Sequence, residues 1–294
     1  MQPWAPPFPP ESATVQVEFG ARSRRGTARS VNEDHYVITR LSRSHDTVVT
    51  SLPESAVRSS FHEHGYVMIV ADGMGGTGTG ESASRRALGT LVQLILYFGR
   101  WNLRVDDMVA HEIMSRAERF YRHVDAALTS EHEPIDDPLQ TTMTAVFGAG
   151  RDLFFAHVGH SRAYLMRQGV LLRLTRDHTI EMRQKTHAPV ARLMDVNATA
   201  RDMKHTLTEA LGMGRARGPT IDLERFQLDD GDVILVCTNG LTDAVSDDTI
   251  SEVMSSVHSP DEMSAALMNR AASAGAEDDA TVLVARYHVP EDEC

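Results

Sequence analysis

Cysteine is almost absent from this 294-residue sequence. Cys237 lies in an apolar run and Cys294 is the last residue, and there are no others. Two cysteines cannot build a disulfide framework, and their scarcity favours a reducing compartment. A chain of this length buries enough apolar surface to fold without disulfides or a structural metal ion.

Long apolar runs are also missing. The most apolar stretch, residues 91–98, is interrupted by Gln93 and falls far short of the roughly 20 residues that cross a bilayer. The N-terminal residues combine neither a basic segment nor an apolar one, so they do not resemble a secretory signal. We therefore expect a soluble cytoplasmic protein without a membrane span.

Basic residues are in deficit. Lys and Arg number 29 against 41 Asp and Glu, which gives a formal net charge of −12. Nucleic acids select proteins with basic patches, so the charge argues against a nucleic-acid partner. Hydrophobic residues make up 41% and charged residues 24% of the chain, and this ordinary composition excludes global disorder.

Apolar periodicity predicts strands and helices in most of the chain. Strands are expected at 35–41, 66–71, 223–228, 232–238 and 281–288, and in a four-strand meander at 142–149, 153–158, 162–167 and 170–174. Helices are expected from about Glu81, over about 106–130, and over about 248–274 with an interruption near Pro260.

The remaining segments are interpreted as connections. Residues 42–64 are Ser-rich and polar and are expected to form a long surface loop, and residues 177–220 show no clean period. Because hairpins alternate with paired helices, two antiparallel sheets covered by helices fit better than a parallel sheet. The length allows about two domains, but we expect a Pro-rich tail at 1–13 and a single domain at 14–290.

A Gly-rich segment, residues 73–78, matches the dinucleotide-binding pattern G-x-G-x-x-G between a strand and a helix. No acidic residue follows between 82 and 105 to hold a ribose, and the next predicted element is a second helix. A P-loop fails as well, because Glu81 stands where that motif needs lysine. A nucleotide-dependent enzyme is kept as an alternative.

Acidic and amide side chains cluster beside four predicted strands, at 32–34, 72–73, 239–243 and 277–279. Each segment alone is typical of a turn. Together, carboxylates at the strand ends of a sandwich would repel one another unless cations neutralised them. Asp72, at the end of a buried strand and followed by glycine, offers the oxygen ligands that hard divalent cations prefer.

Seven segments occur in an order that identifies a family. They are Arg29 with 32–34, then VADGMGG and GESAS (70–84), TAVFGAG to LMRQG (144–169), LTRDHT (174–179), LTEALG (207–212), GDVILVCTNGLTD (231–243) and EDDATVLVARY (277–287). Over residues 17–288 the chain resembles the bacterial form of the metal-dependent protein phosphatases, type 2C. The resemblance implies an α+β fold, a four-layer α-β-β-α sandwich of two antiparallel sheets flanked by helices. It also implies hydrolysis of phosphoserine and phosphothreonine by a hydroxide that bridges two Mn²⁺ or Mg²⁺ ions.

The same resemblance implies metal ligands. Asp72 would bridge both ions, the carbonyl of Gly73 would bind one of them, and Asp278 would be a terminal ligand of the second. Glu33 and Asp34 would bind the ions directly or hold metal-bound water molecules.

Arg29 would clamp the phosphate oxygens, since a planar guanidinium binds them in bidentate fashion. The alternative is a solvated surface arginine. Residues 177–220 would form a flap beside the active site that shapes the choice of substrate. The implied partner is a phosphorylated protein, a target of a Ser/Thr kinase, and we expect a monomer. The Pro-rich tail is interpreted as inert, with a proline-rich ligand as the alternative.

Two positions depart from the family pattern. Asn239 stands where the family has an aspartate that binds the second ion, and the loss of a negative charge predicts a weaker site. Asp243 and His160 mark a possible third-metal region, but the family has aspartate at the position of His160, so a third ion is doubtful. His160 is alternatively a polar turn residue. A pseudophosphatase that binds phosphoproteins without turnover is the alternative function.

Overall fold

A computed structural model of the chain describes residues 15–53, 56–57, 59–75, 78–99, 105–129, 138–186 and 200–290. The predicted Pro-rich tail and part of the predicted flap lie outside these residues.

Ten strands form two antiparallel five-stranded sheets in the described part of the chain. The first sheet has the order β1-β10-β9-β6-β7 and the second β2-β3-β4-β5-β8. The first contains β1 (Gln16–Arg24), β6 (Arg162–Arg167), β7 (Val170–Arg173), β9 (Val233–Cys237) and β10 (Ala280–His288). The second contains β2 (Asp34–Asp46), β3 (Ser60–Met74), β4 (Gln140–Ala149), β5 (Asp152–Val158) and β8 (Asp222–Gln227).

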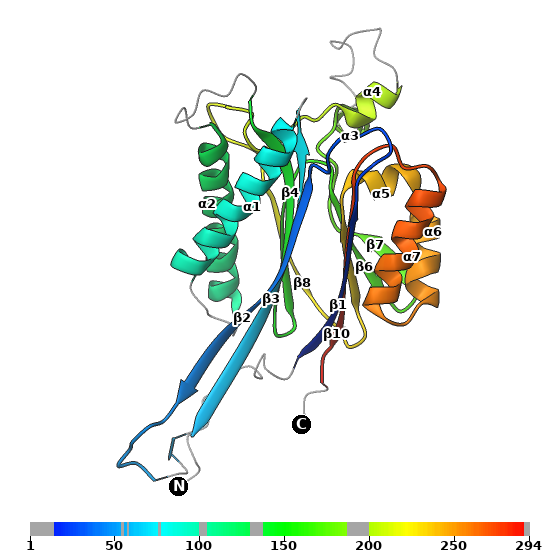
Figure 1. Cartoon of the computed structure of the whole chain (residues 1–294). Helices are drawn as coiled ribbons and strands as arrows, with labels where there is room; N and C mark the ends of the chain where they lie inside the picture. The colour runs from blue at the N-terminus through cyan, green and yellow to red at the C-terminus, as the bar shows by residue number, and fades with distance from the viewer. Residues whose placement is uncertain are drawn as a thin grey trace.

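Helices cover the outer face of each sheet (Figure 1). α1 (Thr79–Phe98) and α2 (Asp107–Thr129) pack on the second sheet, and α5 (Asn239–Ala244), α6 (Asp247–Ser256) and α7 (Pro260–Ser273) pack on the first. Two short helices, α3 (Ile180–Thr186) and α4 (Ala200–His205), lie at one end of the sandwich (Figure 1). Within the described ranges, none of the helices is both long and apolar enough to cross a membrane.

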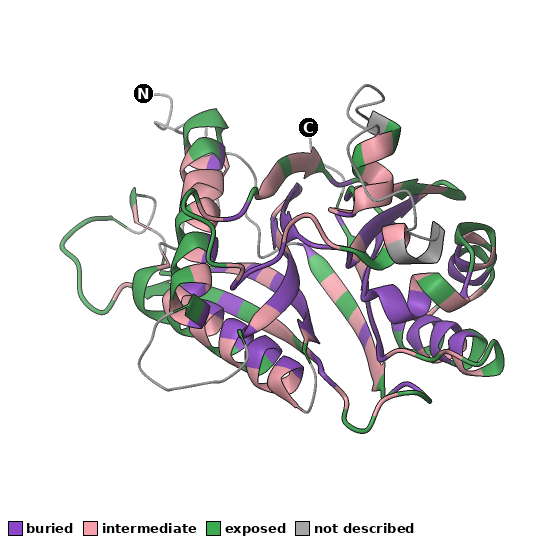
Figure 2. Ribbon diagram, turned by 90° about the horizontal axis from the view of Figure 1, so that it is seen from above, coloured by how far each residue is buried: buried purple, intermediate pink, exposed green. Residues whose placement is uncertain are grey.

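Three apolar clusters hold the four layers together. One lies between the two sheets, and each of the others lies between a sheet and its helices, so buried residues concentrate on the inner surfaces (Figure 2). All five residues of β9 are buried because both faces of its sheet are covered. The predicted α+β four-layer sandwich is confirmed.

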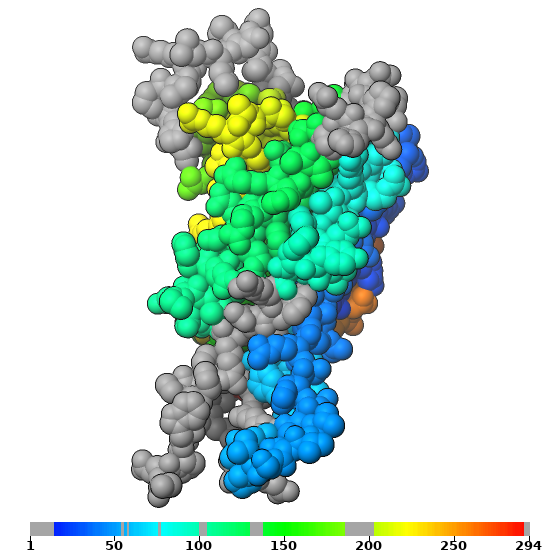
Figure 3. Space-filling model, turned by 90° about the vertical axis from the view of Figure 1, so that its left-hand side faces the viewer, coloured from blue at the N-terminus to red at the C-terminus, as the bar shows by residue number. Residues whose placement is uncertain are grey.

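The predicted surface loop at 42–64 is wrong at its two ends, which belong to strands β2 and β3. β2 continues to Asp46 and β3 begins at Ser60, and these two residues pair directly in the antiparallel register. β4 pairs with β3 only from Gly65 onward, so the outer part of the β2–β3 hairpin has no third strand and projects from the body (Figure 3). Most of its side chains are exposed or half-buried, although Glu63 is buried. A largely polar two-stranded ribbon lacks the apolar alternation by which strands are recognised.

The predicted four-strand meander is also wrong in its connections. β4 and β5 belong to the second sheet, whereas β6 and β7 belong to the first. The chain therefore changes sheets at Gly159, through a short glycine-containing link that resembles a hairpin turn in sequence. In addition, residues 239–243, which were expected in a loop, begin helix α5.

The Gly-rich segment after β3 has a different context from a dinucleotide site. β3 is antiparallel to both of its neighbours, β2 and β4. A dinucleotide fingerprint needs a parallel βαβ unit, so the nucleotide-dependent alternative loses its structural basis.

Replacing Gly159 with alanine is expected to destabilise the fold by about 2 kcal/mol or more. Gly159 has a φ of 114°, and a Cβ there would lie 2.4 Å from the Cβ of Thr142. Gly169→Ala is the matched control, because Gly169 has a φ of 79° but no atom near its Cβ position, and about 1 kcal/mol is expected. Urea unfolding measures both variants, and equal losses would contradict the packing explanation.

Candidate functional site

The loop between β1 and β2 is held against the loop that precedes β10. The amide of Ala28 donates to the carbonyl of Glu277 at 3.0 Å. The two carboxylate oxygens of Asp279 accept hydrogen bonds from the amides of Gly26, at 2.8 Å, and Glu33, at 2.7 Å. One buried carboxylate thus fixes both ends of the loop that carries Arg29.

Asp34 connects the two sheets at this end of the sandwich. It begins β2 of the second sheet, and its Oδ2 accepts hydrogen bonds from the hydroxyls of Thr238, at 2.8 Å, and Thr281, at 2.7 Å, from the first. Burial raises the pKa of Asp34 to about 8, although both hydroxyls oppose the shift. Its other oxygen, Oδ1, is buried and has no hydrogen-bond partner.

Asp72 lies directly opposite Asp34 in the register of β2 and β3. Both residues are almost fully buried, with exposed fractions of 5% for Asp34 and 6% for Asp72. Burial, followed by the charge of Asp34, raises the pKa of Asp72 well above its usual value. Two adjacent buried carboxylates cannot both ionise without a compensating positive charge.

Gly73 and Glu33 pack under the start of α1. The amide of Gly73 donates to the carbonyl of Glu33 at 3.2 Å, and a Cβ on Gly73 would lie 1.8 Å from the carbonyl oxygen of Gly80. Only glycine therefore fits where the main chain approaches the helix. Burial raises the pKa of the Glu33 carboxyl, and the charge of Arg29 opposes that shift.

Arg29 pairs with two of the predicted metal ligands. Its Nε donates to Oδ1 of Asp278 at 2.7 Å, and its Nη1 lies 3.2 Å from Oε2 of Glu33. Burial alone would raise the pKa of Asp278, but the hydrogen bond and charge of Arg29 hold it below its usual value. The side chain of Arg29 is 37% exposed. It is therefore partly open to solvent while it pairs with both carboxylates.

Asn239 and His160 lie on the other side of Asp278. The amide nitrogen of Asn239 donates to Asp243 at 3.3 Å and to Asp278 at 3.4 Å, while its Oδ1 is buried without a partner. Burial lowers the pKa of His160 to about 4, and its Nδ1 is likewise unpartnered. His160 is therefore a neutral imidazole at neutral pH.

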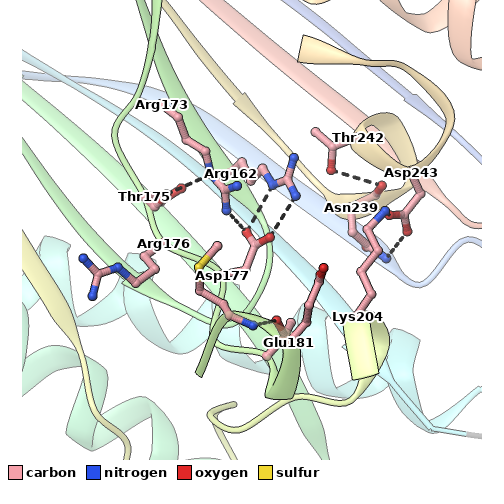
Figure 4. A network of polar contacts seen from close by, with 12 residues as sticks. Arg162, Arg173, Thr175, Arg176, Asp177, Glu181, Lys204, Asn239, Thr242 and Asp243 are labelled. Atoms are coloured by element: carbon pink, nitrogen blue, oxygen red, sulfur yellow. Dashed lines mark hydrogen bonds and ion pairs between the residues drawn. The ribbon is translucent and has the colours of Figure 1, made fainter. Parts of the chain in front are cut away.

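The segment before α3 is anchored by charged side chains (Figure 4). Arg162 on β6 donates to both oxygens of Asp177, at 3.1 and 2.8 Å, and Arg173 pairs with the same carboxylate. His178 contacts Asp222 through Nε2 at 3.1 Å. These contacts fix the entry into the predicted flap.

A cleft with a volume of about 890 Å³ lies beside Arg29 and Asp278. Acidic and basic side chains both line the cleft, so a charged ligand would meet groups of either sign. The charged and histidine residues that line it are Arg29, Glu181, Lys204, His205, Asp243, Glu277 and Asp278.

The chemistry of the donor set fits divalent cations. Asp34 and Asp72 present buried oxygens whose charge is uncompensated, and Asn239 presents an unpartnered buried carbonyl. Among the described residues, no three acidic, histidine or cysteine side chains converge closely enough to form a ligand cluster. The guanidinium of Arg29 pairs with two of the predicted ligands, Asp278 and Glu33.

Sequence reasoning missed several residues that build the site. Asp279 belongs to a predicted acidic segment but received no role, although the adjacent carboxylates made it visible. Thr238 and Thr281, which hold Asp34, carry no sequence signal because threonine is common in strands. Lys204 was invisible, because nothing near it in the sequence indicates a distant carboxylate partner.

Comparisons with known proteins find relatives among the protein phosphatases. The protein phosphatase 2C family model matches residues 35–185, and that of stage II sporulation protein E (SpoIIE) matches residues 175–288. The chain is 29% identical over 274 residues, 92% of its length, to the serine/threonine protein phosphatase PstP of Mycobacterium tuberculosis, and spans 45% of that protein. It is 30% identical over 221 residues to serine/threonine phosphatase stp of Listeria monocytogenes, covering 74% of this chain and 83% of the relative.

A solved structure agrees with the sequence relatives. The catalytic domain of PstP in complex with two manganese ions matches with a TM-score of 0.67 and 27% identity. The match covers 94% of this chain and all of that one. The chain thus resembles bacterial Ser/Thr phosphatases over nearly its whole length but spans less than half of full-length PstP.

The metal-free protein is expected to lose stability as pH rises from about 6.5 to about 8, an interval in which the buried His157 and His160 are neutral in both the folded and the unfolded state. Folded Asp34 keeps its proton up to a pKa of about 8, whereas the usual value is 3.8. The unfolded state then binds fewer protons over this interval, so the free energy of unfolding falls with pH. Urea unfolding in EDTA measures the slope.

Asp34→Asn should flatten that slope, because asparagine has no proton to release and still accepts the threonine hydrogen bonds. Asp46→Asn, at the exposed end of β2, is the control and should keep the wild-type slope. A wild-type free energy of unfolding that rises over this pH interval would contradict the assignment.

Proposed function

Because this chain belongs to the protein phosphatase 2C family, we propose that it hydrolyses phosphoserine and phosphothreonine in phosphoproteins with two bound Mn²⁺ or Mg²⁺ ions. The observation that carries the proposal is the pairing of Asp34 and Asp72. Their carboxylates are adjacent, buried and short of positive charge. A divalent cation would remove this conflict.

The proposed ligands come from both sheets. Asp72 and the carbonyl of Gly73 would hold the ions from the second sheet, and Asp278 and Asn239 would hold one from the first. Glu33 and Asp34 would bind directly or through water, and a third ion near Asp243 and His160 remains doubtful. When bound, the ions would lower the pKa of a water molecule and polarise the phosphate ester.

The chain's own residues would prepare this chemistry. Asp34 holds a proton at a carboxylate oxygen in the metal-free state, since its pKa is about 8, and would release it when cations enter. Arg29 would exchange Asp278 for the phosphate oxygens, for which its planar guanidinium is suited. Asp279 would keep Arg29 in place by fixing its loop.

We further propose which domain is active and which kind of substrate it takes. Residues 14–290 would act as a single phosphatase domain and as a monomer. Residues 177–220 would form a flap that influences the choice of substrate, a protein phosphorylated by a Ser/Thr kinase.

One observation favours a second candidate function. The amide of Asn239 donates toward Asp243 and Asp278, where an aspartate would add negative charge. A chain whose second cation binds too weakly for turnover would be a pseudophosphatase that binds phosphoproteins.

The wild type is expected to hydrolyse p-nitrophenyl phosphate and a phosphothreonine peptide in millimolar Mn²⁺ and to lose this activity in EDTA. Asp72→Asn should lower kcat/KM by about 100-fold or more, because it removes a carboxylate charge that would hold the ions. Asp46→Asn is the matched control and should leave activity unchanged. Wild-type turnover that is absent at every Mn²⁺ concentration would contradict the proposal.

Asn239→Asp is expected to lower the Mn²⁺ concentration for half-maximal activity by about 10-fold. The added carboxylate strengthens the second cation site and removes an N–H donor from it. Gln227→Glu controls for net charge. It adds the same charge at the last residue of β8, outside the proposed ligand set. Turnover in Asn239→Asp alone, with none in the wild type, would favour the pseudophosphatase.

A further inference from the structure

Asp243 is an acidic side chain of the cleft that contacts helix α4. Its Oδ1 lies 2.5 Å from the Nζ of Lys204, and its Oδ2 lies 3.6 Å from the Nδ1 of His205. Oδ2 also accepts a hydrogen bond from the amide of Asn239 at 3.3 Å. Figure 4 shows Lys204 reaching from α4 to this carboxylate on α5.

The surroundings of Asp243 differ from those of Asp34. Asp34 has a buried, unpartnered oxygen, and its charge has no basic partner among the groups that shift its pKa. Asp243 has an ammonium group against one oxygen and donors against the other. Asp243, like Asp278 beside Arg29, is therefore a carboxylate of the cleft whose charge a basic side chain offsets.

Lys204 is held in position by more than its ion pair. The amide of Ile180 donates to the carbonyl of Thr206 at 3.0 Å, and the amide of Thr208 donates to that of His178 at 2.8 Å. These backbone bonds fix the segment after α4 against the segment before α3. Less backbone entropy is then lost when the ion pair of Lys204 and Asp243 forms.

We propose that Lys204 is a built-in counter-ion of the cleft, which excludes a divalent cation from Asp243 and holds α4 beside α5. This inference rests on the proposed function, since it concerns the number of ions that the same cleft accepts. Lys204 is a positioning residue in this scheme, because it acts through Asp243 and touches no reacting atom.

The pairing of Lys204 with Asp243 reduces the negative charge that a ligand would meet in the cleft. The side chains of Lys204 and Asp243 are 38% and 24% exposed, so the pair faces the cleft. An anionic phosphoprotein segment would meet a neutral pair in place of a free carboxylate, and repulsion on this side would be small. The neutral imidazole of His160 adds no further negative charge.

The first test measures Mn²⁺ binding by electron paramagnetic resonance at millimolar Mn²⁺. Lys204→Met should bind about one ion more than the wild type, because Asp243 becomes free. Lys204→Arg should match the wild type, since the guanidinium retains the charge. In the double variant Lys204→Met/Asp243→Asn the extra ion should disappear.

Lys185→Met is the matched control. Lys185 belongs to the same segment and pairs with Glu181 at 2.7 Å, within α3 and without contacting Asp243. Its removal changes the net charge by the same amount and frees another carboxylate of the cleft, that of Glu181. If Lys185→Met gained as many bound Mn²⁺ ions as Lys204→Met, the gain would be a general charge effect and the proposal would be overturned.

The second test measures amide hydrogen exchange over 203–208 in the metal-free protein. Loss of a partly exposed ion pair should speed exchange there by about 2- to 5-fold. Lys204→Met and Asp243→Asn should have equal effects, the double variant should add nothing further, and Lys204→Arg should restore protection.

The outcomes separate this inference from the proposed function. If the wild type binds Mn²⁺ and Lys204→Met gains neither an ion nor faster exchange, the counter-ion role is wrong and the proposed function stands. If the wild type binds no Mn²⁺ but Lys204→Met gains an ion, the proposed function fails and the counter-ion role stands.

Discussion

The contact on which the site depends joins the two sheets through one carboxylate. Asp34, at the start of β2, accepts hydrogen bonds from Thr238 and Thr281 of the opposite sheet. The same register places Asp34 against Asp72. Burying two carboxylates side by side is unfavourable, so the sandwich can close at this end only if a proton or a cation compensates. The candidate metal centre is thus a direct consequence of how the sheets pack.

Positive charge at the cleft comes from the chain as well as from solution. Arg29 pairs with both Asp278 and Glu33, and Lys204 pairs with Asp243. The carboxylates of Asp34 and Asp72 are left to bind protons or divalent ions. The negative net charge that argues against nucleic acids is therefore compatible with a phosphorylated partner, because fixed and bound cations would offset it locally. Membership in the protein phosphatase 2C family agrees with this distribution.

The sequence predicted the regular elements better than their arrangement. Buried runs such as β9 and amphipathic stretches such as α1 and α2 were identified, since their apolar period reflects burial. The outer part of the β2–β3 hairpin was missed because it has polar residues on both faces. The change of sheet at Gly159 was missed because a short glycine link permits either connection. Of the candidate site, the acidic segments and Arg29 were named, but their pairing was not.

What the sequence by itself determined was the set of oxygen and guanidinium groups and their order along the chain, since motifs and apolar periods are local properties. Only the tertiary structure decided which groups meet. Arg29 and Asp278 are 249 positions apart, and Lys204 reaches Asp243 only because α4 lies beside α5. Such pairs carry no local signal, since an ion pair depends on distance in space, and that distance is set when the two sheets and their helices pack together.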